Sequence, residues 1–373
     1  MKRIFLISAV LILASCGEDV NEPGMVPTPD DVTGIINDVI DGQPVIVYAN
    51  SQRGILKAFS GLNSKNEELQ LTTSSLGFPF ILEDQNGINY DFNGRSISSE
   101  ESGDLVPLEQ VVGYWFFFPS FYNEIQLYSG ETIVNPRYPS NSENKVDEDF
   151  VFAGSFPDGI PSIDDPQFDL LEGRALVEAP FYSDLSDSEL VIVITIGGER
   201  FILPHRILEY HEIVNARIAN EAVVISYCPL TGTSKAWSRN VNNKEVEFGV
   251  SGLLYNNNLI LYDRSSDTDW SQILGLGING PYTLQGTSEI DLVEMNLQTA
   301  KTLGSNTNYL STNTGVNFDY NSSPYRTYRT DERITFPLTF SDNRFNAKER
   351  VLGLPFGDNV KIYRFEDFEA EVN

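Results

Sequence analysis

Four side chains in the C-terminal half of the sequence are of the types that bind transition metals. They are His211, Glu212, Cys228 and Asp263, which together offer nitrogen, oxygen and sulfur donors without the short spacing of a zinc motif. An expected helix carries His211 and an expected strand ends at Cys228, so the fold could bring these two groups together. A small-ligand or metal site is therefore one hypothesis, with a transition metal ion as the cofactor that it would take.

The same thiol could instead act as a nucleophile. In that hypothesis His211 activates Cys228, and backbone amides near Gly232 stabilise an oxyanion. No known cysteine-protease signature surrounds the thiol. In a third interpretation Cys228 packs as a small buried hydrophobe, and His211 hydrogen-bonds to a backbone carbonyl. The residues expected to wall a pocket near the thiol are Thr231, Gly232, Thr233, Trp237 and Trp270.

An internal repeat places these groups in one half of the chain. Residues 31–60 align without a gap with residues 209–238, an offset of 178, and eight positions are identical. Only the second copy carries His211 and Cys228. We therefore expect two similar β units, the second holding the site and the first serving as scaffold. The identical positions in the first copy are Ile35, Asn37, Ile40, Val45, Gly54, Lys57, Ala58 and Ser60.

Short β-branched and aromatic runs between turn residues predict a mainly β fold with a few short helices, built from two degenerate repeats packed together. Gly197-Gly198 predicts a two-residue hairpin. Helices are predicted over residues 206–214 and 345–351. Strands are predicted over residues 45–48, 69–73, 78–82, 191–196, 201–203, 223–227, 246–250 and 259–262.

The N-terminal residues have the pattern of a bacterial lipoprotein signal. Lys2 and Arg3 precede an apolar run that is too short to span a bilayer and that ends in Leu13-Ala14-Ser15-Cys16. We expect residues 1–15 to be removed and the Cys16 thiol to be acylated, which would anchor the protein to a membrane. This predicts an outer-membrane lipoprotein of a Gram-negative bacterium, on its periplasmic or cell-surface side.

Composition limits the partners. The chain has 25 basic and 53 acidic residues and a net charge of −28, so nucleic acid is not an expected partner. Once Cys16 is acylated, Cys228 is the only thiol left, and no intramolecular disulfide is expected. The sequence indicates no protein partner. It predicts a tether (16–30), a first repeat (31–139), a charged linker (140–154) and a second repeat (155–373).

The second half also contains a specific set of motifs. They include Asp158-Gly159-Ile160-Pro161, Arg206-Ile207-Leu208, Tyr227-Cys228-Pro229-Leu230-Thr231-Gly232-Thr233, Phe248-Gly249-Val250-Ser251-Gly252 and Lys348-Glu349-Arg350-Val351-Leu352-Gly353. Together they resemble the bacterial domain-of-unknown-function family 3179. The resemblance implies a shared architecture and candidate positions but no activity. The family's usual second cysteine is Thr231 here, which removes a CxxC pair.

The preferred hypothesis is a lipid-anchored small-ligand or metal-binding module with its site in the second repeat. One rival is a thiol-dependent enzyme that uses Cys228 and His211. Another is a structural or partner-binding surface protein in which Cys228 is inert core.

Overall fold

The computed structural model describes residues 32–98, 103–140, 145–170, 180–304 and 307–371. The expected signal peptide (1–15), the expected acylation site Cys16 and the tether (16–30) lie outside these residues. Within the described ranges, no helix is both long and apolar enough to cross a membrane.

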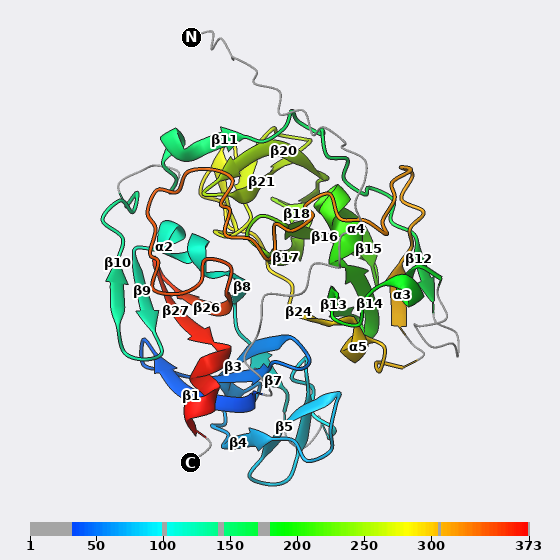
Figure 1. Ribbon diagram of the computed structural model, residues 1–373. Coiled ribbons are helices and arrows are strands. Elements are labelled where there is room, and N and C mark those ends of the chain that lie inside the picture. The colour runs from blue at the N-terminus through cyan, green and yellow to red at the C-terminus, as the bar shows by residue number, and fades with distance from the viewer. Residues whose placement is uncertain (1–31, 99–102, 141–144, 171–179, 305–306, 372–373) are drawn as a thin grey trace.

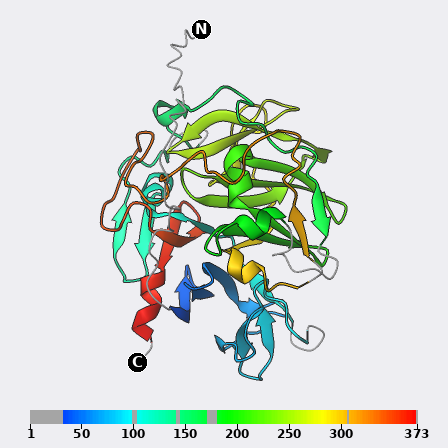
Figure 2. The same cartoon turned by 45° about the vertical axis from the view of Figure 1, so that its right-hand side comes forward.

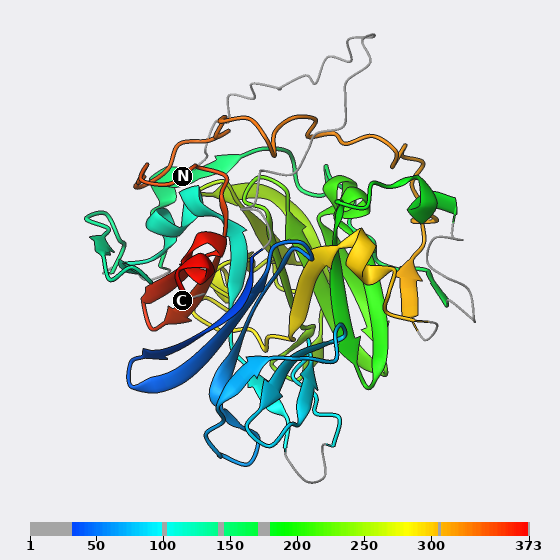
Figure 3. The ribbon, with the colours of Figure 1, turned by 60° about the horizontal axis from the view of Figure 1, so that its bottom comes forward.

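The chain is mainly β with a few short helices, as the sequence predicts. Six sheets stand like blades around a common axis, so the fold is a six-bladed β-propeller (Figure 1). The strands β3, β8, β17 and β24 lie nearest the middle, and the view from the end of the molecule shows the blades following one another around it (Figure 3). Both halves of the chain thus form one ring instead of two β units packed side by side.

We number the blades 1 to 6 around the ring. Blade 1 contains β1 (Thr33–Ile40), β2 (Gln43–Asn50), β3 (Ile55–Asn63) and β7 (Leu105–Pro107). Blade 2 contains β4 (Leu71–Thr73), β5 (Phe80–Asp84) and β6 (Asn89–Asp91). Blade 3 contains, in sheet order, β12 (Phe168–Leu170), β25 (Thr307–Leu310), β14 (Glu199–Pro204), β13 (Leu190–Ile196) and β24 (Leu292–Asn296).

The other three blades follow in the same direction. Blade 4 contains β15 (Ile213–Ile218), β16 (Glu221–Cys228) and β17 (Thr233–Ser238). Blade 5 contains β11 (Val151–Ala153), β20 (Phe248–Tyr255), β21 (Asn258–Asp263), β22 (Asp269–Ser271) and β23 (Leu276–Asn279). Blade 6 contains, in sheet order, β10 (Thr132–Val134), β9 (Glu124–Leu127), β27 (Asn359–Arg364), β26 (Arg350–Phe356) and β8 (Val111–Tyr114).

The remaining elements are small and connect the blades. A two-stranded hairpin consists of β18 (Asn240–Val241) and β19 (Lys244–Glu245). The helices are η1 (Trp115–Phe117), α2 (Phe118–Phe121), η2 (Glu148–Phe150), α3 (Pro180–Asp184), α4 (His205–His211), α5 (Leu297–Ala300) and η4 (Phe365–Glu371).

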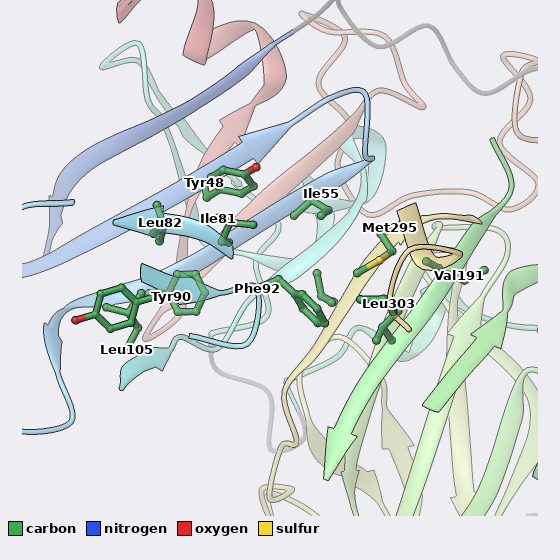
Figure 4. Close-up of a cluster of buried hydrophobic side chains, with 14 of the residues drawn as sticks. Tyr48, Ile55, Ile81, Leu82, Tyr90, Phe92, Leu105, Val191, Met295 and Leu303 are labelled. Atoms are coloured by element: carbon green, nitrogen blue, oxygen red, sulfur yellow. The ribbon is translucent and has the colours of Figure 1, made fainter. Parts of the chain in front are cut away.

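Apolar side chains fill the spaces between neighbouring blades and close the ring. One cluster joins blades 1, 2 and 3, where Tyr48, Phe92 and Met295 meet (Figure 4). Four further clusters join blades 3 and 4, 4 and 5, 5 and 6, and 6 and 1. Because neighbours cover both faces of a blade, its strands can be apolar at successive positions, as in the fully buried run Val191–Ile194 of β13.

Blades 1 and 4 have the same register. The partners Val45 and Ser60 in blade 1 correspond to Val223 and Ser238 in blade 4 at the offset of the sequence repeat. The remaining partners between β2 and β3 match those between β16 and β17 in the same way. The sequence repeat therefore coincides with the three strands β1–β3 of blade 1 and β15–β17 of blade 4, which have identical pairing.

Blades 2 and 5 each contain an equivalent hydrogen bond between an aspartate and an aromatic side chain. Their strands β4–β6 and β20–β22 also follow one another in the same order. The hydroxyl of Tyr90 donates to Asp84 Oδ2 over 3.4 Å in blade 2. In blade 5 the indole nitrogen of Trp270 donates to Asp263 Oδ2 over 3.2 Å. In each case the aspartate closes the turn after β5 or β21.

The C-terminal hairpin completes blade 6. The partners Val351 and Arg364 of β26 and β27 correspond to Val191 and Pro204 of β13 and β14, an offset of 160. β27 then pairs in parallel with β9, as β14 pairs in parallel with β25. Figure 2 shows these C-terminal strands in red beside the strands of the first half.

This arrangement corrects the predicted domain division. Blade 6 takes strands from before residue 140 and from after residue 349, so residues 31–139 do not form a unit alone. The predicted linker, residues 140–154, contains β11, which pairs with β20 and becomes the edge of blade 5.

The secondary-structure predictions hold in part. The Gly197-Gly198 hairpin is confirmed, with both glycines at positive φ, and α4 confirms the predicted helix as far as His211. Residues 213–214 belong to β15 instead of that helix. The helix predicted over residues 345–351 is wrong, because β26 starts at Arg350 and pairs there with β8.

Blade 6 offers a test of this packing. Gly353 in β26 lies against the Phe118 ring, and a Cβ added to it would also come within 2.9 Å of Val360. We expect Gly353→Ala to lower the free energy of unfolding by about 1–3 kcal/mol through overpacking. Urea unfolding would measure this, with Gly286→Ala as the control because nothing lies within 4 Å of its added Cβ. Equal stability of the two variants would contradict the packing.

Candidate functional site

A cavity of about 270 Å³ lies on the propeller axis, and we call it the axial cavity. Its walls come from β3, from β17 and from the segments that lead into β8 and β24. These are corresponding elements of the two halves, so the cavity lies where the repeated parts of the chain face each other.

Two buried lysines stand at matching positions of β3 and β17, and Lys235 lines the cavity. Lys57 and Lys235 are related by the repeat offset and are 1% and 3% exposed. Lys57 forms an ion pair with Asp291 and donates to the carbonyl of Leu292 over 3.2 Å. Lys235 Nζ lies 2.7 Å from Glu289 Oε1. Both ammonium groups therefore have carboxylate partners on the segment before β24.

A third carboxylate belongs to the same cavity. Glu109 precedes β8 and, within the described residues, has no hydrogen bond or ion pair. Glu109 is an exposed residue, but partial desolvation by the surrounding protein raises the pKa of its carboxyl, the charge of Glu289 raises it further, and Lys235 opposes the shift. The cavity thus contains negative charge that the protein itself neutralises only partly.

Glu294 forms the inner end of the axial cavity. Its Oε1 accepts a hydrogen bond from Ser234 Oγ over 2.5 Å and lies 3.0 Å from His205 Nε2, and its Oε2 accepts from Arg350 over 2.6 Å. Burial would raise the pKa of this carboxyl, but the charge of Arg350, followed by that of His205, lowers it to about 2. Glu294 is therefore ionised throughout the neutral range.

A smaller space of about 50 Å³ lies where His205, Tyr227 and Arg350 meet, and we call it the inner chamber. His205 stacks on Tyr227, with ring centres 4.0 Å apart. Arg329 and Lys348 complete the charged part of its lining.

The polar groups on the axis are not repeated in both halves. Ser234 of β17 stands where β3 has Leu56, and Glu294 stands in the ladder position that Val112 occupies in β8. His205, the first residue of α4, likewise corresponds to Phe365, the first residue of η4. The second half therefore supplies most of the site's polarity.

The structure separates the two residues proposed as a nucleophile and its base. His211 Nδ1 lies 2.7 Å from the carbonyl oxygen of Pro161, and its Nε2 lies 2.5 Å from the Tyr320 hydroxyl, among side chains between blades 3 and 4. Cys228 packs between blades 4 and 5, and its thiol donates to the carbonyl of Asn257 over 3.5 Å. The two side chains thus face opposite sides of blade 4.

Glu212, not His211, is the ionisable group near the thiol. Burial raises the pKa of Cys228 to about 11, and the charge of Glu212 contributes to the shift. Burial also raises the pKa of Glu212 to about 7, although a hydrogen bond from Tyr325 opposes this change. These groups form a poorly ionised pair inside the core, which does not favour a thiolate.

The expected pocket residues have mainly structural contacts. Thr231 and Thr233 share a buried network with Asn258 and Gln272. Of the residues expected near the thiol, Gly232 is the one that lines the inner chamber. Its φ is 63°, and a Cβ added to it would come within 2.8 Å of the Tyr114 ring.

Both expected pocket tryptophans belong to the core. Trp237 and Trp270 pack with their rings edge-on to Phe248. Asp263 accepts hydrogen bonds from Trp270 and from residues of its own turn. Burial would raise the pKa of Asp263, but the hydrogen bonds from Ser266, Ser265 and Trp270 lower it. The two tryptophans therefore pack in the core between blades 4 and 5, and Asp263 closes a turn of blade 5.

The described part of the chain contains no group of three or more His, Cys, Asp or Glu side chains placed to hold a metal ion. His211, Cys228 and Asp263 each have separate protein partners. Glu212 lies near Cys228, but His211 and Asp263 have partners elsewhere, so the four residues proposed as metal ligands are not brought together as a set.

Comparison with known protein families identifies the family of the chain. The family model described as protein of unknown function DUF3179 matches residues 157–373, more than half of the chain. The chain belongs to this family. The DUF3179 match includes His205, Ser234, Glu294 and Arg350, whereas Glu109 and the other first-half residues of the axial cavity precede it. Neither the curated proteins nor the solved structures gave a match.

Sequence analysis missed most of the residues on the axis of this DUF3179 protein. The conserved pair of lysines in the internal repeat was a usable signal for Lys57 and Lys235. His205 stands one residue before the predicted helix, and no sequence pattern marks it as a site residue. Glu294 and Arg350 have no local pattern to distinguish them, since 53 acidic side chains offer many candidates.

The thiol of this DUF3179 protein should be unreactive in the folded state. A pKa of about 11 instead of 9.0 lowers the thiolate fraction about a hundredfold at neutral pH, and burial adds steric protection. We expect alkylation of residues 17–373 by iodoacetamide at pH 7.5 to be at least about a hundredfold slower than alkylation in urea. Rapid reaction of the folded protein would instead support a catalytic thiol.

Glu212 should make stability depend on pH. Its folded pKa of about 7 exceeds the ordinary value of 4.5, so the stabilisation is complete below about pH 4.5 and is lost as pH rises through 7. The full loss corresponds to about 3 kcal/mol. Urea unfolding between pH 4.5 and 8.5 should show a shallower decline for Glu212→Gln, which keeps an acceptor for Tyr325. Parallel profiles for variant and wild type would refute the assignment.

Proposed function

We propose that this DUF3179 protein is a small-ligand-binding propeller that takes its ligand in the axial cavity. The observation that carries the proposal is the cavity itself, about 270 Å³ in volume and lined by ionic side chains from both halves. Small-molecule sites are concave, typically about 300–1,000 Å³, and combine apolar walls with a few polar groups. The axial cavity lies near the lower end of that range, so a small metabolite is the expected ligand.

The charges favour a ligand with an amino group. Lys57 and Lys235 already have carboxylate partners, and Glu294 is neutralised by Arg350. Glu109 has no partner in the described residues and lies beside another carboxylate. A ligand cation placed there would gain a charge-assisted hydrogen bond and relieve repulsion between like charges.

The proposed setting is extracytoplasmic. A signal peptide followed by acylation of Cys16 supports an outer-membrane lipoprotein of a Gram-negative bacterium, held on the periplasmic or cell-surface side by its lipid. The shared registers support an origin from two repeats, with the second contributing the site's polarity. The net charge of −28 argues against nucleic acid as a partner.

The rival functions differ in their support. Catalysis by Cys228 with His211 is disfavoured by the raised thiol pKa and by the opposite orientation of the two side chains. A purely structural or partner-binding role remains the second candidate, because Cys228 packs as an ordinary core residue. That role predicts no small-molecule binding on the axis.

Calorimetric titration with small amines tests the proposal. Ethanolamine and glucosamine would be compared with ethylene glycol and glucose, using residues 17–373. We expect saturable binding of at least one amine, and about a tenfold or greater loss of affinity in Glu109→Gln, because a charge-assisted bond is removed.

The control for this titration is Glu221→Gln, which removes an exposed carboxylate at the start of β16. It should bind the amine as the wild type does. If no amine binds, or if Glu109→Gln and Glu221→Gln behave alike, the amine-binding assignment fails.

A further inference from the structure

The inner chamber has a different chemistry from the axial cavity. Its charged lining consists of Arg329, Lys348 and Arg350, which lie with His205 and two tyrosines, Tyr114 and Tyr227. None of its lining residues within the described chain is a carboxylate. Glu294, which closes the inner end of the axial cavity, contacts the chamber residues His205 and Arg350.

Carboxylates outside this lining hold the side chains of Arg329 and Lys348 in place. Arg329 lies 3.4 Å from Glu189 and 2.5 Å from Glu209, and Lys348 lies 3.1 Å from Asp331. Arg350 is fixed in the same way by Glu294 at 2.6 Å. The cationic groups are therefore positioned before any ligand arrives, which lowers the ordering cost of binding.

Two buried polar atoms beside the chamber lack partners. His205 is 1% exposed, and its Nδ1 has no hydrogen-bond partner among the described residues. The same holds for Nε of Arg350. Buried nitrogen atoms are nearly always paired, so these two atoms indicate a missing partner within the chamber.

The size of the chamber limits what that partner can be. One water needs roughly 10–15 Å³ of such a space, so about 50 Å³ holds a few waters or one small polyatomic ion. A metabolite the size of a sugar does not fit. The lining offers guanidinium and ammonium donors and no carboxylate, so an anion is the species that can accept charge-assisted hydrogen bonds there.

We infer that the inner chamber binds a small oxyanion, either an inorganic ion such as phosphate or the carboxylate of a small organic acid. Arg329, Lys348 and Arg350 supply its positive environment, and His205 Nδ1 and Arg350 Nε are the unpaired atoms available to it. This site goes beyond the amine-binding proposal and does not depend on it, because the groups that carry it lie outside the wall around Glu109.

The two histidines of the chain give a direct test in the unmodified protein. Residues 17–373 would be titrated with phosphate, sulfate or formate against chloride at constant ionic strength, since the net charge makes salt effects large. The imidazole nitrogen resonances would be followed by NMR, with His211→Gln used for assignment. We expect a saturable shift of the His205 signals and no comparable shift of the His211 signals. Saturation by phosphate or sulfate identifies an inorganic ion, and saturation by formate alone identifies a carboxylate.

A pair of variants tests the role of charge in opposite directions. Glu294→Gln removes the carboxylate that neutralises Arg350, so the anion should bind about tenfold or more tightly. Glu294→Gln combined with Arg350→Met should lose at least that gain. A general loss of stability would weaken binding in both variants and cannot produce the opposite changes.

The matched control is Lys301→Met with Asp187→Asn, which removes an ion pair outside the axis without changing the net charge. This control should bind the anion as the wild type does. The inference is overturned if none of the three anions shifts the His205 signals saturably, or if Glu294→Gln fails to tighten binding. Amine binding by the same protein would be unaffected by that result, so the two proposals fail separately.

Discussion

One buried carboxylate holds the centre of the propeller together. Glu294 of blade 3 binds Arg350 of blade 6 and Ser234 of blade 4, and it lies beside His205. A buried charge is tolerated only when it is well paired, and removal of one partner typically costs about 3–5 kcal/mol. The ring therefore depends on matched charge at its centre, whereas apolar contacts fill the spaces between blades.

The strand pairing of the two halves is nearly symmetric, but the side chains on the propeller axis differ between the halves. Blades 1 and 4 share their register, yet Leu56 of one corresponds to Ser234 of the other. In the same way Val112 and Glu294 occupy equivalent positions in β8 and β24. At these two positions the first half is apolar and the second is polar, so the axial cavity has unlike side chains at matching places in its wall.

The sequence predicts local features of this fold well because local chemistry determines them. The Gly197-Gly198 hairpin follows from residues that tolerate positive φ, and the repeat of residues 31–60 anticipates the matching strands of blades 1 and 4. The ring was not predictable in this way, because blades 3, 5 and 6 pair strands from distant parts of the chain. For the same reason the sequence left the distance between His211 and Cys228 open: His211 ends α4 and packs between blades 3 and 4, whereas Cys228 of β16 packs between blades 4 and 5.

The position of β26 and β27 also bears on how the chain reaches its native state. These strands lie between β8 and β9 in blade 6, so the two parts of that sheet cannot be joined until residues 350–364 are available. Contacts between segments so far apart in sequence form slowly, and unpaired strand edges are prone to aggregation until they form. A nascent chain would thus carry an open blade until almost its last residues were delivered. In the proposed export of an unfolded chain across a membrane, this order would keep the ring from closing before residues 350–364 had crossed.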